Sequence, residues 1–326
     1  MNSSDETHYE PPRLEWSRIR MKSRSARAHK LELAALGETP EPGCTFRDWF
    51  VSLPDVLGAS ELRQTVDAVV AARRADRPVV FAFGGHVVKT GCSAIVIDLI
   101  ERGIITALAT NGSGAIHDLE LAETGATSEE VAETIRDGSF GMVHETCARM
   151  HEAARRGAEG VGLGRALGEL LEDGPVPHKR LSLFAAAARA GIPATVHVAL
   201  GTDTVHMHPD ADGAAIGAAT MADFRTICAV VADLGAGRES GAGGVWMNVG
   251  SAVVMPEVFL KAVSVARNLG HDLDALHTAN FDMLRHYRPQ QNVILRPVRP
   301  GHGHSILGQH EILLPLFRQA VIEALG

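Results

Sequence analysis

The chain has 326 residues, a formal net charge of −8 and 45% hydrophobic residues, which is typical of a globular protein. This acidic balance argues against nucleic-acid binding, and no run approaches the roughly 20 apolar residues of a membrane span. The four widely spaced cysteines lack zinc-site spacing, and the amino terminus lacks a secretory pattern. We therefore expect a cytoplasmic protein with reduced thiols and a small-molecule partner, without nucleic acid or membrane.

The first 45 residues differ from the rest in pattern. They contain Pro11, Pro12, Pro40 and Pro42 and only weak periodicity, whereas regular helical and strand patterns begin near residue 46. The sequence predicts an N-terminal extension at 1–45 and a single domain at 46–326.

Strand and helix patterns alternate along the domain. In its first half we expect, in chain order, a helix at 60–76, a strand at 78–85, a helix at 92–103, a strand at 105–110 and helices at 128–138 and 180–191. In its second half we expect a strand at 193–200, a helix at 221–235, a strand at 243–250, a helix at 255–270, strands at 274–280 and 291–298, and a helix at 311–325. This alternation predicts an α/β, Rossmann-like fold with a mainly parallel sheet and helices on both faces.

Glycine, serine, threonine and asparagine gather where the predicted strands end. The stretches are "GGHVVKTG" (84–91), "TNGSGAIHD" (110–118), "GTDTVHMHP" (201–209), "NVGSAVVMPE" (248–257) and "HTANFD" (277–282). Such turns let backbone N–H groups approach a phosphate, and several at one sheet edge favour a nucleotide-sized ligand. None has the spacing of the Rossmann fingerprint or the P-loop. The first two turns offer these cofactor-binding candidates: Gly84, Gly85, His86, Thr90 and Asn111.

The same stretches, in the same order, resemble the deoxyhypusine synthase family over roughly residues 46–325. The family's Thr-Thr-Ala-Gly-Gly turn is matched by Thr110-Asn111-Gly112-Ser113-Gly114, and its Thr-Ala-Gln-Glu-Phe-Asp stretch by "HTANFD". The resemblance implies an NAD-binding fold and a homo-oligomer, a tetramer in the family. It also implies that the following residues bind the cofactor: Thr110, Gly112, Ser113, Gly114, Asp203, Gly250, Ser251, Ala279 and Asp282.

The chain departs from that family where the family's catalytic lysine should lie. Its five lysines are Lys22, Lys30, Lys89, Lys179 and Lys261, so none follows "HTANFD". The segment that follows is rich in arginine and histidine instead. We therefore expect no polyamine chemistry, and an anionic or polyol substrate bound by Arg285, His286 and Arg288.

Four residues are candidates for catalysis. His206 and His208 share a face of an extended segment and are suited to proton transfer, Lys89 to anchoring an anion or forming an imine, and His117, next to Asp118, to accepting a proton. His206 and His208 are also spaced as metal ligands, but a metal would need a third ligand. For His144 with Glu145, a helix face is the preferred interpretation over a catalytic pair.

The sequence thus predicts an NAD-dependent enzyme, a transferase or oxidoreductase, acting on a non-polyamine, anionic or polyol molecule by transient hydride transfer. Two alternatives stay open at this point. One is a metal-dependent lyase or hydrolase using His206 and His208, and the other is a non-catalytic nucleotide-binding protein.

Overall fold

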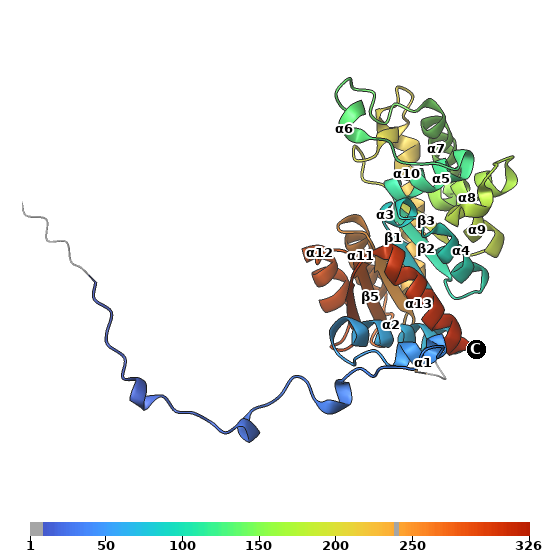
Figure 1. Cartoon of the computed structure of the whole chain (residues 1–326). Coiled ribbons are helices and arrows are strands. Elements are labelled where there is room, and N and C mark those ends of the chain that lie inside the picture. Colours follow the sequence, from blue (N-terminus) through green and yellow to red (C-terminus); the bar gives the residue numbers. More distant parts are fainter. Residues whose placement is uncertain (1–8, 238–240) are drawn as a thin grey trace, which may run out of the picture.

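A computed structural model describes residues 9–237 and 241–326 (Figure 1). Its strands are β1 (Val79–Phe83), β2 (Ala107–Asn111), β3 (Ala194–His197), β4 (Val245–Val249), β5 (His277–Asp282) and β6 (Gly303–Leu307). Its longer helices are α2 (Leu57–Arg74), α4 (Ser93–Glu101), α5 (Gly112–Thr124), α7 (His144–Arg156), α8 (Leu163–Asp173), α9 (Leu183–Ala190), α10 (Gly213–Ala232), α11 (Val254–Asn268) and α13 (His310–Leu325). The shorter ones are α1 (Phe46–Val51), α3 (His86–Lys89), α6 (Val131–Thr134) and α12 (Tyr287–Pro289).

The six strands form one parallel sheet in the order β3-β2-β1-β4-β5-β6. The chain builds outward from β1 to β3 and then returns to β4 on the other side of β1. The order therefore reverses between β1 and β4, and in open α/β sheets this reversal leaves a crevice at the carboxyl ends of the strands. The predicted α/β, Rossmann-like fold is confirmed.

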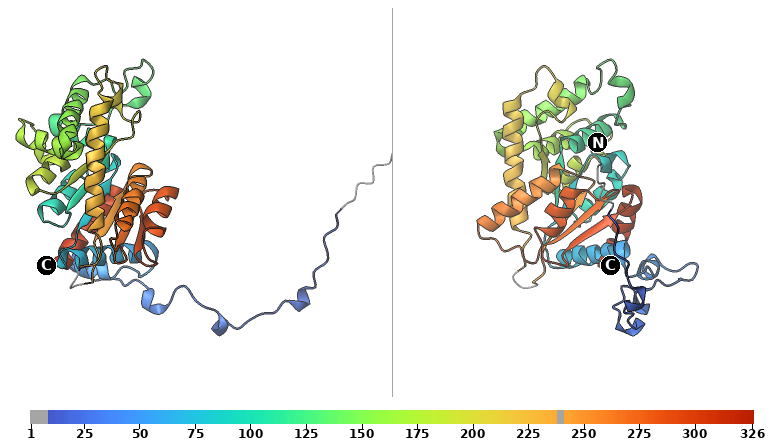
Figure 2. Two further views of the ribbon diagram at one scale, coloured as in Figure 1. Left: turned by 180° about the vertical axis from the view of Figure 1, so that it is seen from behind. Right: turned by 90° about the vertical axis from the view of Figure 1, so that its left-hand side faces the viewer.

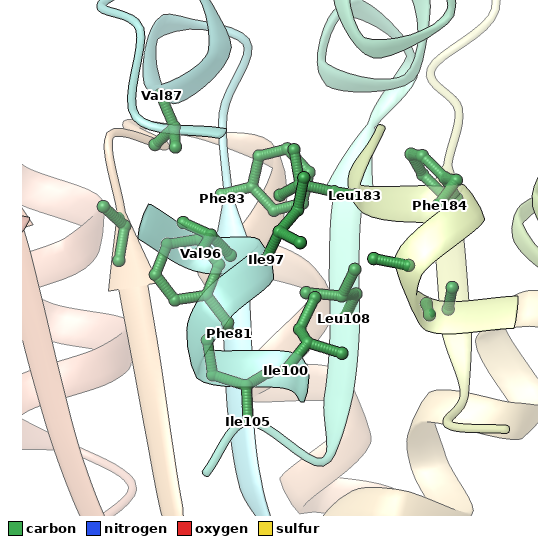
Figure 3. Close-up of a cluster of buried hydrophobic side chains, with 14 of the residues drawn as sticks. Phe81, Phe83, Val87, Val96, Ile97, Ile100, Ile105, Leu108, Leu183 and Phe184 are labelled. Carbon is green, nitrogen blue, oxygen red and sulfur yellow. The ribbon is translucent and has the colours of Figure 1, made fainter. Parts of the chain in front are cut away.

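Helices cover both faces of the sheet (Figure 2). On one face, Phe81 and Phe83 of β1 pack with Val96 and Ile100 of α4 (Figure 3). Residues of α2 and α13 belong to the same core. On the other face, Trp246 of β4 packs with residues of α10 and α11. Both cores are continuous apolar clusters because strands buried on two faces carry apolar side chains at successive positions.

The outer edge of β3 is covered by side chains of α10 rather than by another strand. Asp223 accepts hydrogen bonds from the backbone N–H of Val196 (2.7 Å) and of Gly164 at the start of α8 (2.9 Å). Thr220 donates to the carbonyl oxygen of Val196 (2.9 Å) and accepts from the N–H of Val198 (3.0 Å). The backbone groups of an edge strand are thereby satisfied within the fold.

Helix α10 is, within the described residues, the single helix long and apolar enough to cross a bilayer. Its buried residues include Asp223, Ile227 and Val231, and it packs against β3 and α11. A long core helix meets the same length and composition criterion, so α10 gives little support to a membrane span.

Residues 9–45 are almost wholly exposed and run away from the sheet, with three short 3₁₀ turns (Figure 1). A capping box at Thr45 and Asp48 then begins α1. The division into an extension at 1–45 and a single domain at 46–326 stays a prediction, and residues 1–8 lie outside the described residues.

Two predicted elements are wrong, and a third begins later than predicted. The predicted strand at 291–298 is a π-helical turn, Gln290–Leu295, and the last strand is β6 instead. The predicted helix at 128–138 is reduced to the single turn α6. The strand expected at 274–280 begins only at His277, because residues 271–276 form the connection from α11.

Candidate functional site

The turns after β1 and β4 touch each other where the strand order reverses. The N–H of Gly84 donates to the carbonyl oxygen of Val249 (3.0 Å), and a Cβ atom on Gly84 would lie 2.2 Å from the carbonyl oxygen of Gly250. Gly250 itself has a φ of +62°, which few other residues adopt. Glycine is therefore required on both turns for the strands to end side by side.

A cavity of about 480 Å³ lies at this point. Seven predicted cofactor-binding residues line it, together with two predicted catalytic residues, and these are Gly84, Gly85, His86, Asn111, Ser113, Gly250, Ser251, Lys89 and His117. They come from the turns after β1, β2 and β4, which are distant in the sequence. We refer to this space as the switch-point cavity.

Two helices begin at the wall of the switch-point cavity. At the start of α5, Asn111 Oδ1 accepts from the N–H of Gly114 (3.1 Å) and from Ser113 Oγ (3.1 Å). At the start of α11, Ser251 Oγ accepts from the N–H of Met255 (3.2 Å). The first-turn N–H groups of a helix and its positive end favour a bound anion.

A second cavity, also of about 480 Å³, adjoins the first and shares Lys89, Ser113 and His117 with it. We call it the outer cavity. Its other polar side chains are carboxylates and hydroxyls, namely Glu120, Glu129, Asp203, Thr127, Thr146, Thr202, Thr204 and Ser128. Among residues 9–237 and 241–326, no arginine lines either cavity.

His117 lies between the two cavities, with its ring fixed from one side. Its Nδ1 is 2.8 Å from Thr127 Oγ1, which donates a hydrogen bond of 2.6 Å to Glu120 Oε2. Burial lowers the pKa of His117, although nearby Glu120 opposes that shift, and Lys89 lowers the pKa further. The lowered pKa favours the neutral form of the ring.

Asp118 does not partner His117, contrary to the possibility raised by their adjacency. Its carboxylate is fully buried and accepts from Ser182 Oγ and from the N–H of Leu183 (2.7 Å), so it holds the start of α9. Burial raises the pKa of Asp118 to about 6 despite these hydrogen bonds. Successive residues of a helix point about 100° apart, which separates the two side chains.

Asp203 lines the outer cavity rather than the switch-point cavity. Its carboxylate lies against α5, where a Cβ atom on Gly112 would be 1.9 Å from Asp203 Oδ2. Burial raises the pKa of Asp203 to about 6. A carboxyl group with this pKa changes its charge close to neutral pH.

His206 and His208 line neither cavity. His206 Nδ1 accepts from the N–H groups of Gly201 and Asp203 (both 3.2 Å), so the ring stabilises its own loop. His208 Nδ1 accepts from the N–H of Asp210 (3.1 Å), and its ring lies 5.5 Å from that of His151. The catalytic role predicted for this pair stays a prediction, without support from the cavities.

The metal alternative is not supported. In residues 9–237 and 241–326, no group of three or more histidine, cysteine, aspartate or glutamate side chains is arranged to hold a metal ion. His208 approaches His144 and His151 instead, with ring centroids 5.7 and 5.5 Å away. His144 begins α7 and is exposed, as the helix interpretation of His144 and Glu145 predicts.

The remaining predicted cofactor-binding residues do not line the switch-point cavity. Some of them bond or pack against the backbone next to it, and the others lie away from it. Thr110 donates to the carbonyl oxygen of Phe83 (2.7 Å), Thr90 donates to that of His86 (3.0 Å), and Gly114 lies against Thr110. Ala279 is buried inside β5, in the core formed with α2 and α13. Asp282 ends β5 and accepts from the N–H of Leu284 (3.2 Å).

The predicted substrate-binding residues line neither cavity. Arg288 Nε lies 3.3 Å from Glu257 Oε1, and His286 Nε2 lies 3.8 Å from Asp282 Oδ1. Arg285 is exposed beside them. Arg288 therefore meets a carboxylate of α11 rather than a pocket open to a ligand.

The sequence prediction missed four site residues, which are Glu120, Thr127, Glu129 and Thr146. Of these, Glu120 was the easiest to predict, because it lies three residues after His117 and therefore on the same helix face. Thr127, Glu129 and Thr146 reach the site only through the path of the chain between α5 and α7.

No family model and no curated protein matches the chain. Solved structures with a similar fold include a putative LOR/SDH protein of Methanococcus maripaludis S2, with a TM-score of 0.51 and 12% identity over 82% of this chain and 71% of that one. They also include AgrE in complex with ornithine and NAD+, with a TM-score of 0.52 and 14% identity over 82% of this chain. This chain spans 34% of the AgrE chain, or about a third of its length.

A putative deoxyhypusine synthase from Entamoeba histolytica is also among these structures, with a TM-score of 0.48 and 11% identity over 88% of this chain and 96% of that one. The solved structures thus include a protein described as a member of the family that the sequence resembles. At such low identity, the similarity to the LOR/SDH protein and to AgrE establishes a shared fold and nothing finer.

Proposed function

We propose that the chain is an NAD-dependent enzyme that acts on a polyhydroxylated small molecule. The observation that carries this proposal is the switch-point cavity, at the carboxyl ends of parallel strands and lined by the turns after β1, β2 and β4. This is where Rossmann-like sheets bind dinucleotides. AgrE, which shares the fold, was solved with ornithine and NAD+ bound.

The residues of the switch-point cavity fit a dinucleotide. The glycines at 84 and 250 let the turns after β1 and β4 pack closely, because a Cβ atom on Gly84 would meet Gly250 and one on Gly250 would meet His310. Asn111 and Ser251 already accept from the N–H groups of Gly114 and Met255, so the other first-turn N–H groups of α5 and α11 would bind a pyrophosphate. Lys89, which is exposed, adds a positive charge at the same wall. NAD, when bound, supplies a reversible hydride acceptor, as required for transient oxidation followed by transfer, elimination or epimerisation.

The outer cavity would hold the substrate. Its carboxylates and hydroxyls can accept hydrogen bonds from substrate hydroxyl groups, and its lining within the described residues has three carboxylates and one lysine. Of the two predicted substrate classes, this lining favours a polyol over an anion. Lys89 and His117, which belong to both cavities, are the proposed catalytic residues.

We further propose that the enzyme works in the cytoplasm as a homo-oligomer, a tetramer by the family resemblance. The molecular mass by light scattering, at several protein concentrations, tests the assembly. A monomer at all concentrations would contradict it.

Charge reversal at Lys89 should weaken NAD+ binding. We expect Lys89→Glu to raise the Kd for NAD+ about tenfold or more, because it places a negative charge beside the pyrophosphate site. Lys89 is exposed at the surface, so the fold should be unaffected. Isothermal titration of both proteins with NAD+ measures the change.

Lys30→Glu is the matched control, because Lys30 is exposed in the N-terminal segment, outside both cavities. It makes the same change of net charge and should leave the Kd unaltered. If the unaltered protein does not bind NAD+ at millimolar concentration, the proposed function is wrong. An equal loss in the two variants would argue against binding at the switch-point cavity.

A further inference from the structure

We propose that His117 is a general base oriented by a hydrogen-bonded relay through Thr127 to Glu120, and that it takes the proton of a substrate hydroxyl group in the outer cavity. This inference rests on the proposed function for its substrate. The relay joins α5, which carries His117 and Glu120, to the segment between α5 and α6, which carries Thr127.

The direction of each hydrogen bond in the relay follows from the groups present. An ionised carboxylate can only accept, so the Thr127 hydroxyl donates its one proton to Glu120 Oε2 (2.6 Å). Thr127 Oγ1 must therefore accept from His117 Nδ1, 2.8 Å away. The neutral ring then carries its proton on Nδ1, and Nε2 is left with a free lone pair.

Both carboxylate oxygens of Glu120 accept a hydrogen bond, which fixes this side chain at the end of the relay opposite His117. Its second oxygen, Oε1, accepts from Thr146 Oγ1 of α7 (3.2 Å). His117 Nδ1 lies 3.9 Å from Glu120 Oε2, so positive charge on the ring would be stabilised across the threonine. An oriented imidazole backed by a carboxylate is the arrangement that general-base catalysis requires.

Because His117 lines both cavities and its Nδ1 is bonded to Thr127, we infer that Nε2 is the nitrogen open to them. His117 lines both of them, and its Cδ2 atom, which is bonded to Nε2, approaches the backbone of Gly85 so closely that a Cβ there would be 2.8 Å away. Glycine at position 85 thus lets the ring reach the turn after β1. Lys89, from α3, is the cationic group facing this ring.

The proton step is balanced by groups already named. The O–H bond of the substrate would break and an N–H bond would form at Nε2, which makes the ring an imidazolium. The O–H electron pair would become the second bond of the carbonyl as the adjacent C–H bond breaks, and the hydride from that C–H bond would pass to the nicotinamide cofactor of the proposed function, which is the oxidant. His117 returns the same proton when the carbonyl is reduced again.

The tautomer of His117 tests the relay without cofactor or substrate. By ¹⁵N NMR of the full chain, with His117→Gln to assign the signal, we expect a neutral ring protonated on Nδ1. Thr127→Val should abolish this preference, because valine cannot accept from Nδ1, whereas Thr127→Ser should preserve it. Glu120→Gln should lower the pKa of His117 further, since it removes the carboxylate that opposes the lowering.

Diethyl pyrocarbonate, which modifies unprotonated imidazole nitrogen, reports the reactivity of Nε2. We expect His117 to be modified in the unaltered protein and several-fold more slowly in Thr127→Val, with Thr127→Ser close to normal. His271, which is exposed on the surface after α11, should react equally in all variants and serves as the internal control.

A ring protonated on Nε2 in the unaltered protein would overturn this inference. So would a tautomer and reactivity unchanged by Thr127→Val. Failure to bind NAD+ would instead overturn the proposed function, because none of these measurements uses the cofactor. Thr127→Val should bind NAD+ normally, since Thr127 lines only the outer cavity.

Discussion

Asp223→Ala is expected to lower the free energy of unfolding by about 3 kcal/mol or more, because it leaves buried N–H groups without an acceptor. These belong to Val196 in β3 and Gly164 at the start of α8, and Asp223 is only 1% exposed. Urea denaturation at pH 7 measures the loss. Asp210→Ala, at an exposed loop position, is the control and should change stability by less than about 0.5 kcal/mol.

Asp223→Asn separates the contribution of the hydrogen bonds to stability from that of the charge, because asparagine keeps an acceptor oxygen but cannot ionise. Burial raises the pKa of Asp223 to about 7 in the folded protein, so between about pH 4 and pH 7 the folded state binds more protons than the unfolded state. The contribution of this carboxyl group to stability is therefore full near pH 4 and declines as the pH rises to 7. Relative to Asp223→Asn, the unaltered protein should lose stability across that window. If the unaltered protein instead gains stability relative to Asp223→Asn as the pH rises from 4 to 7, the pKa of Asp223 is not raised.

Gly84→Ala should abolish measurable NAD+ binding and destabilise the fold by about 3 kcal/mol, as overpacking against rigid backbone does at its upper range. The added Cβ would lie 2.2 Å from the carbonyl oxygen of Gly250, and no side-chain rotation relieves that contact. The turns after β1 and β4 must separate, which disrupts the switch-point cavity. Thermal unfolding and NAD+ titration give the two readouts.

Gly217→Ala is the matched control for Gly84→Ala. A Cβ atom on Gly217 meets nothing within 4 Å, and the residue lies inside α10. Alanine is favoured over glycine in a helix by about 1 kcal/mol, so this variant should be slightly more stable and bind NAD+ normally. If Gly84→Ala behaves like Gly217→Ala, the close contact of the two turns is not required for the site.

The fold was predictable where local pattern and topology agree. The apolar run of β1, followed by "GG", and that of β4, followed by Gly250, mark strands that end at tight turns, and a parallel sheet brings those ends to one edge. The switch-point cavity follows from these two facts. For this reason Gly84, Gly85 and Asn111 could be named from the sequence pattern, and they are found together with Ser113, which the family resemblance implied.

The last strand was misassigned because the segment predicted as a strand, residues 291–298, has a more strand-like sequence than the actual strand β6. Gln291–Val298 is rich in β-branched and apolar residues, whereas β6 reads "GHSIL" and includes His304. Residues Val293 and Ile294 are buried, but they pack against β4 and α11 from a turn. Short apolar runs do not distinguish a strand from another buried segment.

Thr127, the direct hydrogen-bond partner of His117, could not be predicted from the sequence for a related reason. Adjacency favoured Asp118, but the helical rotation turns that side chain into the core, where it holds α9. Helix α5 ends at Gly125, which has a left-handed conformation, and the chain that follows places Thr127 next to His117. Only the tertiary path of residues 125–130 brings the hydroxyl to the ring.

The side chains of α10 on β3 also limit how copies of this chain can associate. With the N–H and carbonyl of Val196 and the N–H of Val198 already bonded to Asp223 and Thr220, β3 offers no row of free groups for a strand from a second molecule. A second copy therefore cannot extend the sheet by pairing a strand with β3, and edge-to-edge aggregation at this strand is prevented. Any assembly at this end of the sheet must join through helix surfaces, where side chains rather than backbone decide the partner.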